Sequence, residues 1–265
     1  MALKQHLDPT VRFQQQVDNA AKYVLPFVQQ TVNLGIHTRV LEIGCGEGGV
    51  LKPFLQIGCE VVGVDLNEIR IDLAKGYLQA EVQAGKAVLL CQNVYEEAFL
   101  QTYQHQFDLI ILKDTIEHIP EQEKFIPYLK NFLKPRGQIF FGFPPWYMPF
   151  GGHQQVCKNK LASILPYYHL LPAPVYKFML KAFGESDVAI EELMEVKETG
   201  ISIERFERIV HNSGLKVLAK QHFLINPIYY YKFGWKPRKQ LGIISALPFF
   251  RNFLTTCVYY TVGEK

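Results

Sequence analysis

The stretch RVLEIGCGEGGVLKPFLQIGCEVVGVDLN, residues 39–67, predicts a strand, a glycine turn, a helix and a second strand in that order. Residues 39–43 are mostly apolar and favour β-structure, as a strand buried on both faces does. The glycines that follow allow a tight turn that brings the backbone close to a ligand. The second strand, residues 59–64, ends at Asp65, an acid placed to hydrogen-bond a ribose. The unit is therefore typical of a site for a nucleoside-containing molecule.

The residue that distinguishes between nucleoside cofactors is Glu42, two positions before the first glycine. Gly44, Gly46 and Gly49 satisfy the G-x-G-x-x-G pattern of nicotinamide dinucleotide sites. Asp65 follows at about the ~20-residue spacing expected there. However, a carboxylate beside the turn would repel a pyrophosphate. S-adenosylmethionine carries an ammonium, a sulfonium and an adenosine but no phosphate, so Glu42 favours this cofactor over NAD.

Two segments, VLEIGCGEG from residue 40 and VVGVDLN from residue 61, resemble the first two motifs of the class I S-adenosylmethionine-dependent methyltransferases. The resemblance runs in motif order from about Val40 to Phe143. It implies a cofactor site whose residues are Glu42, Gly44, Cys45, Gly46, Asp65, Leu66, Asn93, Val94 and Lys113.

The resemblance also implies a role for each part of this set. Glu42 is expected to hold the amino end of the cofactor, indirectly or through water, and Asp65 to bind the ribose hydroxyls. The backbone around Lys113 is expected to face the methionine end. Leu66 and Val94 are expected to border the adenine.

Asn93 occupies the position where the family usually has an acid that contacts the adenine amino group. The side-chain carbonyl of Asn93 accepts the same kind of hydrogen bond. An asparagine that only forms a local turn is the competing interpretation.

Five predicted strands, at residues 39–43, 59–64, 87–91, 107–112 and 138–143, alternate with helical segments. This alternation indicates a parallel sheet covered on both faces. Residues 215–225 and 256–262 are predicted as the sixth and seventh strands, and they match the closing antiparallel hairpin of the family. The expected fold is therefore α/β and Rossmann-like, a seven-stranded mostly parallel sheet with an inserted helical and aromatic lid.

The domain organisation is expected to be a single methyltransferase domain over residues 1–265. Residues 1–35 would form cover helices, which either contact the cofactor or only pack over the core. The lid, residues 144–200, follows the carboxyl end of the fifth strand, where α/β folds bind ligands, so it should form much of the acceptor pocket. The other parts are a cofactor-binding core at 36–143 and a closing segment at 201–265 that includes an embellishment at 226–255.

His153 and His118 are the candidate catalytic residues. Methyl transfer from a sulfonium is an in-line displacement, and a hydroxyl acceptor must also lose a proton. His153 follows two glycines beyond the fifth strand, and a free imidazole pKa of about 6.5 suits proton acceptance; some ubiquinone-pathway O-methyltransferases have a similar Gly-x-His. A histidine that orders the lid is the alternative for His153, and a local hydrogen-bonding role is the alternative for His118. With a base available no metal is required.

The aromatic lid allows three interpretations, which are a packed lid, an apolar or aromatic acceptor pocket, and a membrane-docking surface. Stacking on nucleic acid is disfavoured, because the net charge is only +3 and no base-methylation motif follows the fourth strand. His169 is expected to be packed rather than catalytic. The basic residues that favour membrane docking are Lys177, Lys181, Lys232, Lys236, Arg238 and Lys239.

Composition indicates a globular protein, since 48% of the 265 residues are hydrophobic and 20% are charged. The cysteines are scattered without metal-ligand spacing, which predicts a reduced cytoplasmic protein and no structural metal site. The first ten residues show no secretory pattern, and no apolar run reaches the ~20 residues that span a bilayer. The five cysteines are Cys45, Cys59, Cys91, Cys157 and Cys257.

These observations predict an S-adenosylmethionine-dependent methyltransferase acting on a small, apolar or aromatic acceptor, with O-methylation favoured. One alternative is a catalytically silent S-adenosylmethionine-binding or membrane-surface scaffold protein. A less favoured alternative is an NAD-dependent oxidoreductase.

Overall fold

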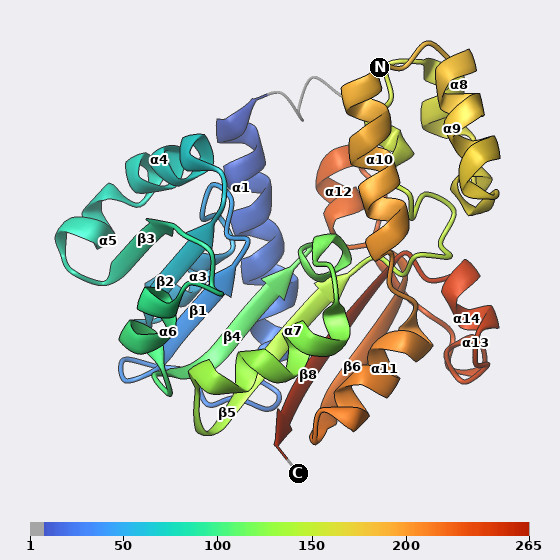
Figure 1. The fold of residues 1–265 in the computed structure, drawn as a ribbon. Coiled ribbons are helices and arrows are strands. Elements are labelled where there is room, and N and C mark those ends of the chain that lie inside the picture. The colour runs from blue at the N-terminus through green and yellow to red at the C-terminus, as the bar shows by residue number, and fades with distance from the viewer. Residues whose placement is uncertain (1–7, 265) are drawn as a thin grey trace.

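A computed structural model describes residues 8–264, and its centre is one eight-stranded sheet (Figure 1). The strand order is β3-β2-β1-β4-β5-β8-β6-β7. The first five strands are parallel, and β8 runs antiparallel to both β5 and β6. The first seven residues, on which the expectation about a secretory pattern partly depends, lie outside the described residues. The strands are β1 (Arg39–Ile43), β2 (Glu60–Asp65), β3 (Ala87–Cys91), β4 (Phe107–Lys113), β5 (Leu133–Phe143), β6 (Leu215–Ile225), β7 (Arg238–Lys239) and β8 (Cys257–Glu264).

The predicted α/β fold with a mostly parallel sheet is confirmed, but the sheet has eight strands rather than seven. The additional strand, β7, has two residues and pairs antiparallel with β6 at Phe223 and Ile225. It lies inside the predicted 226–255 embellishment. A two-residue edge strand is too short to produce an alternating pattern, so the sequence carried no signal for it.

The central strands bury both faces, and successive residues alternate between two cores. Val40 of β1 lies in one core, whereas Leu41 and Ile43 lie in the other. β4 does the same with Leu109 and Ile110. This is the period-two geometry of a strand covered by helices on both sides.

The helices form two layers over the faces of the sheet and a separate group beyond the carboxyl ends of its parallel strands (Figure 1). α3 and α4 pack on one face, together with the segment from η2 to α2, and α6, α7 and α11 pack on the other. The helices before the lid are α1 (Pro9–Asn19), η2 (Ala20–Val24), α2 (Leu25–Val28), α3 (Leu51–Gln56), α4 (Glu68–Tyr77), α5 (Gln79–Gln83), α6 (Glu97–Tyr103), η3 (Ile116–His118), α7 (Gln122–Tyr128) and η4 (Leu129–Phe132). Those of the lid and closing segment are η5 (Gln154–Val156), α8 (Lys160–Ile164), η6 (Tyr168–Leu170), α9 (Ala173–Ala182), α10 (Asp187–Thr199), α11 (Ile203–Asn212), α12 (Ile228–Phe233), α13 (Gly242–Ser245) and α14 (Phe250–Phe253).

Helix starts follow local capping chemistry. The Asp8 carboxylate accepts a hydrogen bond from the Thr10 backbone N–H at 2.9 Å, and Pro9 is the first residue of α1. Asn67 caps α4 in the same way by accepting from the Arg70 N–H at 3.1 Å. Both caps are short-range signals that the sequence itself carries.

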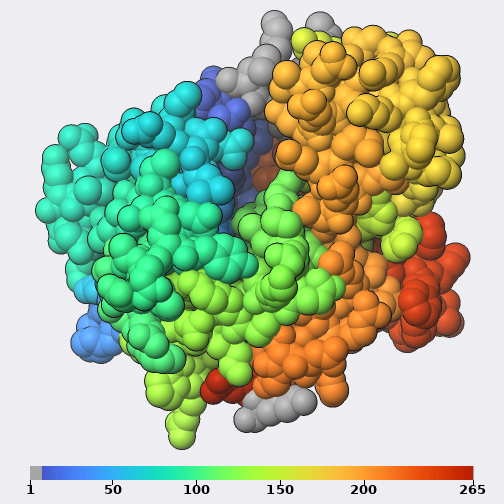
Figure 2. All heavy atoms as spheres, viewed as in Figure 1, coloured from blue at the N-terminus to red at the C-terminus, as the bar shows by residue number. Residues whose placement is uncertain are grey.

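The lid helices α8, α9 and α10 stand together beyond the carboxyl ends of the parallel strands (Figure 1). They enclose a small core of their own, which includes Tyr168, Tyr176, Leu180 and Leu193. In the space-filling view a hollow separates the lid from the region of α4 (Figure 2). The lid therefore borders the strand ends, where the predicted site residues lie.

All five cysteines, each within the described chain, have free thiols. Among residues 8–264, no helix combines the length and the apolar character needed to cross a membrane.

Candidate active site

The glycine turn after β1 is tied to the end of β2. The backbone N–H groups of Gly44 and Cys45 donate to the Val64 carbonyl at 2.8 and 3.0 Å. Gly44 has a φ of +74°, and a Cβ at this position would lie 2.7 Å from the Thr115 side chain. Only glycine combines this backbone conformation with this close approach. The turn therefore needs glycine at Gly44 for its shape.

Asp65 connects the turn to the next loop, because its carboxylate accepts two backbone hydrogen bonds. The N–H of Gly46 donates to Oδ2 and the N–H of Asn67 to Oδ1, both at 2.9 Å. Each carboxylate oxygen has more than one lone pair, so both remain able to accept from a ligand. Asp65 lies at the carboxyl end of β2, as predicted.

A cavity of about 570 Å³ opens beside Asp65, with a mostly apolar wall. Leu66 and Val94 line it, together with Tyr95, whose ring also contacts Phe125. Asn93 lines it too, but its side-chain carbonyl already accepts a hydrogen bond from the Tyr95 N–H at 3.0 Å. Asn93 therefore forms the local turn of the competing interpretation. One lone pair of its side-chain carbonyl remains for a ligand.

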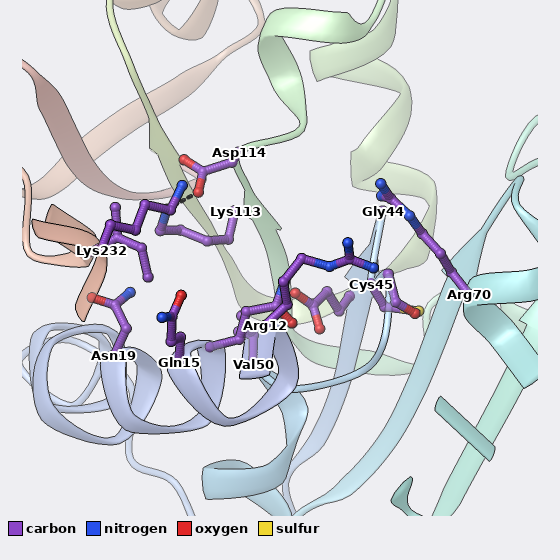
Figure 3. A pocket seen from close by; sticks show the side chains of 14 residues that line it. Arg12, Gln15, Asn19, Gly44, Cys45, Val50, Arg70, Lys113, Asp114 and Lys232 are labelled. Carbon is purple, nitrogen blue, oxygen red and sulfur yellow. Dashed lines mark hydrogen bonds and ion pairs between the residues drawn. The ribbon is translucent and has the colours of Figure 1, made fainter. Parts of the chain in front are cut away.

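A second cavity, of about 230 Å³, lies between the glycine turn and α1 (Figure 3). Glu42 and Cys45 line it, and both are almost fully buried. Burial raises the pKa of Glu42, the negative charge of Asp65 raises it further, and Lys113 partly opposes this effect. The Oε2 atom of Glu42 is buried and has no hydrogen-bond partner among the described residues. A buried carboxylate that lines a cavity and has an unpartnered oxygen favours a cationic ligand.

Lys113 also lines this second cavity, at the carboxyl end of β4. Its side chain is buried and forms an ion pair with Asp114 (Figure 3). Burial alone would lower the pKa of Lys113, but Asp114 and the buried Tyr259 outweigh that effect and raise it. Lys113 is therefore a neutralised part of the wall rather than an unpaired cation.

The cover helix α1 closes the second cavity. Gln15, Gln16 and Asn19 line it from this helix. The guanidinium of Arg12 donates from Nε to the Glu47 carboxylate at 3.1 Å, which joins α1 to the glycine turn. The N-terminal helices thus pack on the core and, through α1, also line this cavity.

A third cavity, of about 390 Å³, lies on the lid side of the same strand ends. His118 and His153 both line it, with ring centroids 4.9 Å apart. Partial burial lowers the pKa of His118, whose residue keeps an exposed part. Fuller burial lowers the pKa of His153 to about 4, and the neighbouring His118 contributes to this shift. Both rings are therefore neutral at physiological pH. The two candidate catalytic histidines, 35 positions apart along the chain, are brought together.

A family model described as a methyltransferase domain matches residues 13–156, more than half of the chain. The chain belongs to the methyltransferase-domain family. The match covers the glycine turn, all three strand-end loops described above and the beginning of the lid.

Relatives of this methyltransferase domain include two proteins named ubiquinone biosynthesis O-methyltransferase. That of Coxiella burnetii (strain RSA 493 / Nine Mile phase I) is 33% identical over 118 residues, which are 44% of this chain and 47% of the relative. That of Histophilus somni (strain 2336) is 29% identical over 143 residues, covering 51% and 58%. The chain thus spans about half the length of the curated relatives it matches.

Solved structures share the fold of the methyltransferase domain at low sequence identity. The geranyl diphosphate C-methyltransferase of Streptomyces coelicolor A3(2) has a TM-score of 0.59 and 12% identity, with 94% of this chain and 78% of that chain covered. The cyclase SpnF has a TM-score of 0.55 and 12% identity, with coverage of 92% and 81%. Because a methyltransferase and a cyclase share this fold, the likeness supports the architecture and not a particular reaction.

S-adenosylmethionine is the cofactor of this family. The cavity beside Asp65 and the cavity between the glycine turn and α1 together fit it. The orphaned oxygen of Glu42 suits its ammonium group, and the Asp65 carboxylate lies beside the larger cavity as a ribose partner would. The apolar wall with Leu66 and Val94 suits the adenine. The cavities share Gly44, so one ligand bound across both would pass directly over the turn.

Sequence reasoning missed several residues of this site. Asp114 and Arg70 each line all three cavities. Asp114 directly follows the predicted fourth strand, so its position was a usable signal. Lys232 was counted among the basic surface residues, but it lies on α12 and lines the inner cavity (Figure 3), where burial lowers its pKa. Nothing in its local sequence distinguishes it from the exposed Lys236.

Proposed function

We propose that this chain transfers the methyl group of S-adenosylmethionine to a hydroxyl oxygen of a small, apolar or aromatic acceptor, as one domain over residues 1–265. The observation that carries the proposal is the buried Glu42 carboxylate, which lines the cavity between the glycine turn and α1 and whose Oε2 atom has no hydrogen-bond partner among the described residues. An amino acid ammonium satisfies this oxygen, whereas a dinucleotide pyrophosphate would be repelled by it. S-adenosylmethionine joins such an ammonium to an adenosine.

The acceptor is proposed to bind in the lid-side cavity. Pro144, Met148 and Phe150 give it an apolar side, and Gln155 and Asn226 give it polar groups. This mixture suits an aromatic ring that carries a hydroxyl group. The names of the two bacterial relatives, both O-methyltransferases of ubiquinone biosynthesis, support a phenolic acceptor.

His118 and His153 are proposed to act on the acceptor hydroxyl, because both rings line the acceptor cavity and are neutral there. Replacement of His153 by Gln should then lower kcat strongly while cofactor affinity stays unchanged. Normal turnover of the His153→Gln variant would show that His153 only orders the lid.

Calorimetry and turnover test the activity together. We expect micromolar binding of S-adenosylhomocysteine and no binding of NAD. Turnover of labelled S-adenosylmethionine should then appear with at least one acceptor in a panel of phenols and lipids. NADH binding with hydride-transfer absorbance would instead indicate an oxidoreductase. Cofactor binding without turnover on any acceptor would indicate a scaffold.

A peripheral membrane contact is the second function that an observation favours. The embellishment after β6 exposes large apolar side chains, including Ile243 at 73% and Phe249 at 71% exposure. The exposed cations Lys236, Arg238 and Lys239 lie in the same segment, and they complement anionic lipid. The lid contributes Phe178, which is 70% exposed. The free thiols of the five cysteines support a cytoplasmic location for such a contact.

Co-sedimentation with vesicles tests this contact and locates it. Binding to anionic vesicles should exceed binding to neutral vesicles and should fall with salt. The Phe249→Ser variant should lose binding if the embellishment docks, and the Phe178→Ser variant should lose it if the lid docks. Equal recovery with and without vesicles would remove the proposal.

A further inference from the structure

Three potential metal ligands meet at the wall of the acceptor cavity. Glu117 and His118 belong to η3, which follows β4, and His153 belongs to the turn at the start of the lid. One ligand atom from each of these residues lies within 4.8 Å of the others. All three residues line the same lid-side cavity.

The Glu117 carboxylate is the least satisfied group in this cluster. The residue is 2% exposed, and both carboxylate oxygens are buried with no hydrogen-bond partner in the described chain. Its backbone carbonyl, in contrast, accepts from the Thr199 hydroxyl at 2.6 Å. A buried carboxylate without partners is costly unless a proton or a cation neutralises it.

The two histidines present free ring nitrogens to this carboxylate. Within residues 8–264, neither ring forms a hydrogen bond. Neutral imidazole is the form that binds metal ions. His153 is also held at a φ of +56°, in the left-handed region that non-glycine residues rarely adopt. Such strain persists where the surrounding structure requires it, and functional sites are where it is most often found.

We propose that Glu117, His118 and His153 bind a divalent transition-metal ion, and that Zn²⁺ matches this donor set best. Two imidazole nitrogens and one carboxylate are the protein ligands of a common type of catalytic zinc site, in which a further position stays open. Ligand atoms about 2.0–2.1 Å from Zn²⁺ stand about 3.3 Å apart in tetrahedral geometry. The cluster must therefore contract by roughly 1.5 Å, which a change in the His118 side-chain rotamer would supply, because part of this residue is open to solvent.

This inference rests on the proposed function for its chemical role. The open position faces the acceptor cavity, where an acceptor hydroxyl would bind the ion and lose its proton more easily. The oxygen then forms a bond to the methyl carbon, and the carbon–sulfur bond breaks. The electron pair stays on sulfur, which becomes a neutral thioether, and the hydroxyl proton leaves to solvent. No redox change occurs, so an ion without redox chemistry is sufficient.

Nearby charges set the strength of binding. Arg70 and Lys232 line the same cavity and oppose a free cation. Asp114 also lines it, but its charge is paired with Lys113. An anionic phenolate would reduce the repulsion between these groups and the ion, so we expect Zn²⁺ to bind more tightly when a phenol is present.

Metal binding should be measured directly, without reference to turnover. Chelator-treated protein is titrated with Zn²⁺ by calorimetry, and Co²⁺ substitution reports ligand geometry through its visible absorbance. We expect one ion per chain, with at least about tenfold weaker binding in Glu117→Gln and His153→Gln. The matched control is His211→Gln, which replaces an exposed histidine of α11 and should bind as wild type does.

Titration with S-adenosylhomocysteine separates this inference from the proposed function and reports folding in every variant. Cofactor binding with no stoichiometric Zn²⁺ binding would overturn the metal site and leave the methyltransferase proposal intact, with Glu117 protonated and His153 free as a base. Zn²⁺ binding without cofactor binding would overturn the methyltransferase proposal and leave the metal site intact. Equal Zn²⁺ affinity in wild type and Glu117→Gln would also overturn the assignment.

Discussion

The Asp65 carboxylate accepts the Gly46 backbone N–H at 2.9 Å, so the end of β2 holds the glycine turn that follows β1. The acid proposed to bind the ribose is therefore also a structural part of the turn. Substitutions at Asp65 combine these two effects, and the first prediction separates them.

The Asp65→Asn variant keeps one oxygen that accepts from the turn, whereas Asp65→Ala removes both. Hydrogen bonds to a charged partner contribute about 1.5–3 kcal/mol. We therefore expect S-adenosylhomocysteine to bind roughly 10–100-fold more weakly to Asp65→Ala, with Asp65→Asn between it and wild type. Calorimetry measures this, with the exposed Asp72→Ala as control. Unchanged affinity in Asp65→Ala would make the ribose assignment wrong.

Replacing Glu42 by Gln should stabilise the cofactor-free protein and weaken cofactor binding. The folded-state pKa of Glu42 lies above its unfolded value, so the folded chain keeps a proton that the unfolded chain releases. Wild-type stability thus falls as pH rises above about 4.5, and the advantage of Glu42→Gln should grow over the same range. Thermal unfolding at pH 5 and pH 8 tests this. A variant less stable than wild type at pH 8 would contradict the prediction.

Alanine at Gly44 should destabilise the chain and abolish cofactor binding. The left-handed conformation costs a non-glycine residue about 1–2 kcal/mol, and the new Cβ also meets Thr115 at 2.7 Å. Gly76 is the matched control, since it lies within α4 with no atom within 4 Å of its added Cβ. Gly76→Ala should raise stability by about 0.5–1 kcal/mol. Opposite shifts in melting temperature are the expected result.

Acidification should loosen the lid through His169, which is fully buried as predicted. Its Nε2 lies 2.9 Å from the Trp146 carbonyl, and burial lowers its pKa to about 4. Between pH 6.5 and pH 4 the unfolded chain binds a proton that the folded chain excludes, so stability falls by at most about 3 kcal/mol. His169→Gln should reduce this pH dependence, and His222, with a pKa of about 4, should retain part of it. Unfolding curves of wild type and His169→Gln at pH 7.5 and pH 5 test this. The same stability difference between the two pH values in both proteins would contradict the prediction.

The sequence allowed prediction of features that depend on neighbouring residues. The caps at Asp8 and Asn67, the glycine turn and the acid at Asp65 each follow from local chemistry, and all are present. The two-residue β7 has no such signal. The segment Lys134–Gly137 has the composition of a turn, and although it lies within the bounds of β5, Arg136 has a φ of +67° and the pairing with β4 skips from Leu133 to Gln138. Its turn chemistry is therefore expressed as a bulge inside the strand.

The site was only partly predictable, because burial depends on segments far apart in the chain. Glu117 and His118 are adjacent in sequence, yet nothing local distinguishes the buried carboxylate from the exposed imidazole. His153 reaches them only because the lid turn folds back over η3. Lys232 points inward for a similar reason, since α12 packs against α1.

The contact between Arg12 and Glu47 joins α1 to the glycine turn beside the cavity proposed for the amino acid end of the cofactor. The helix lines one side of the cavity proposed for the amino acid end of the cofactor, so we expect opening of this contact to speed the release of a spent cofactor. Release of the cofactor would then be coupled to the movement of α1, which carries neither of the proposed catalytic histidines. The turnover rate of the enzyme would in that case be set by how often its first helix detaches.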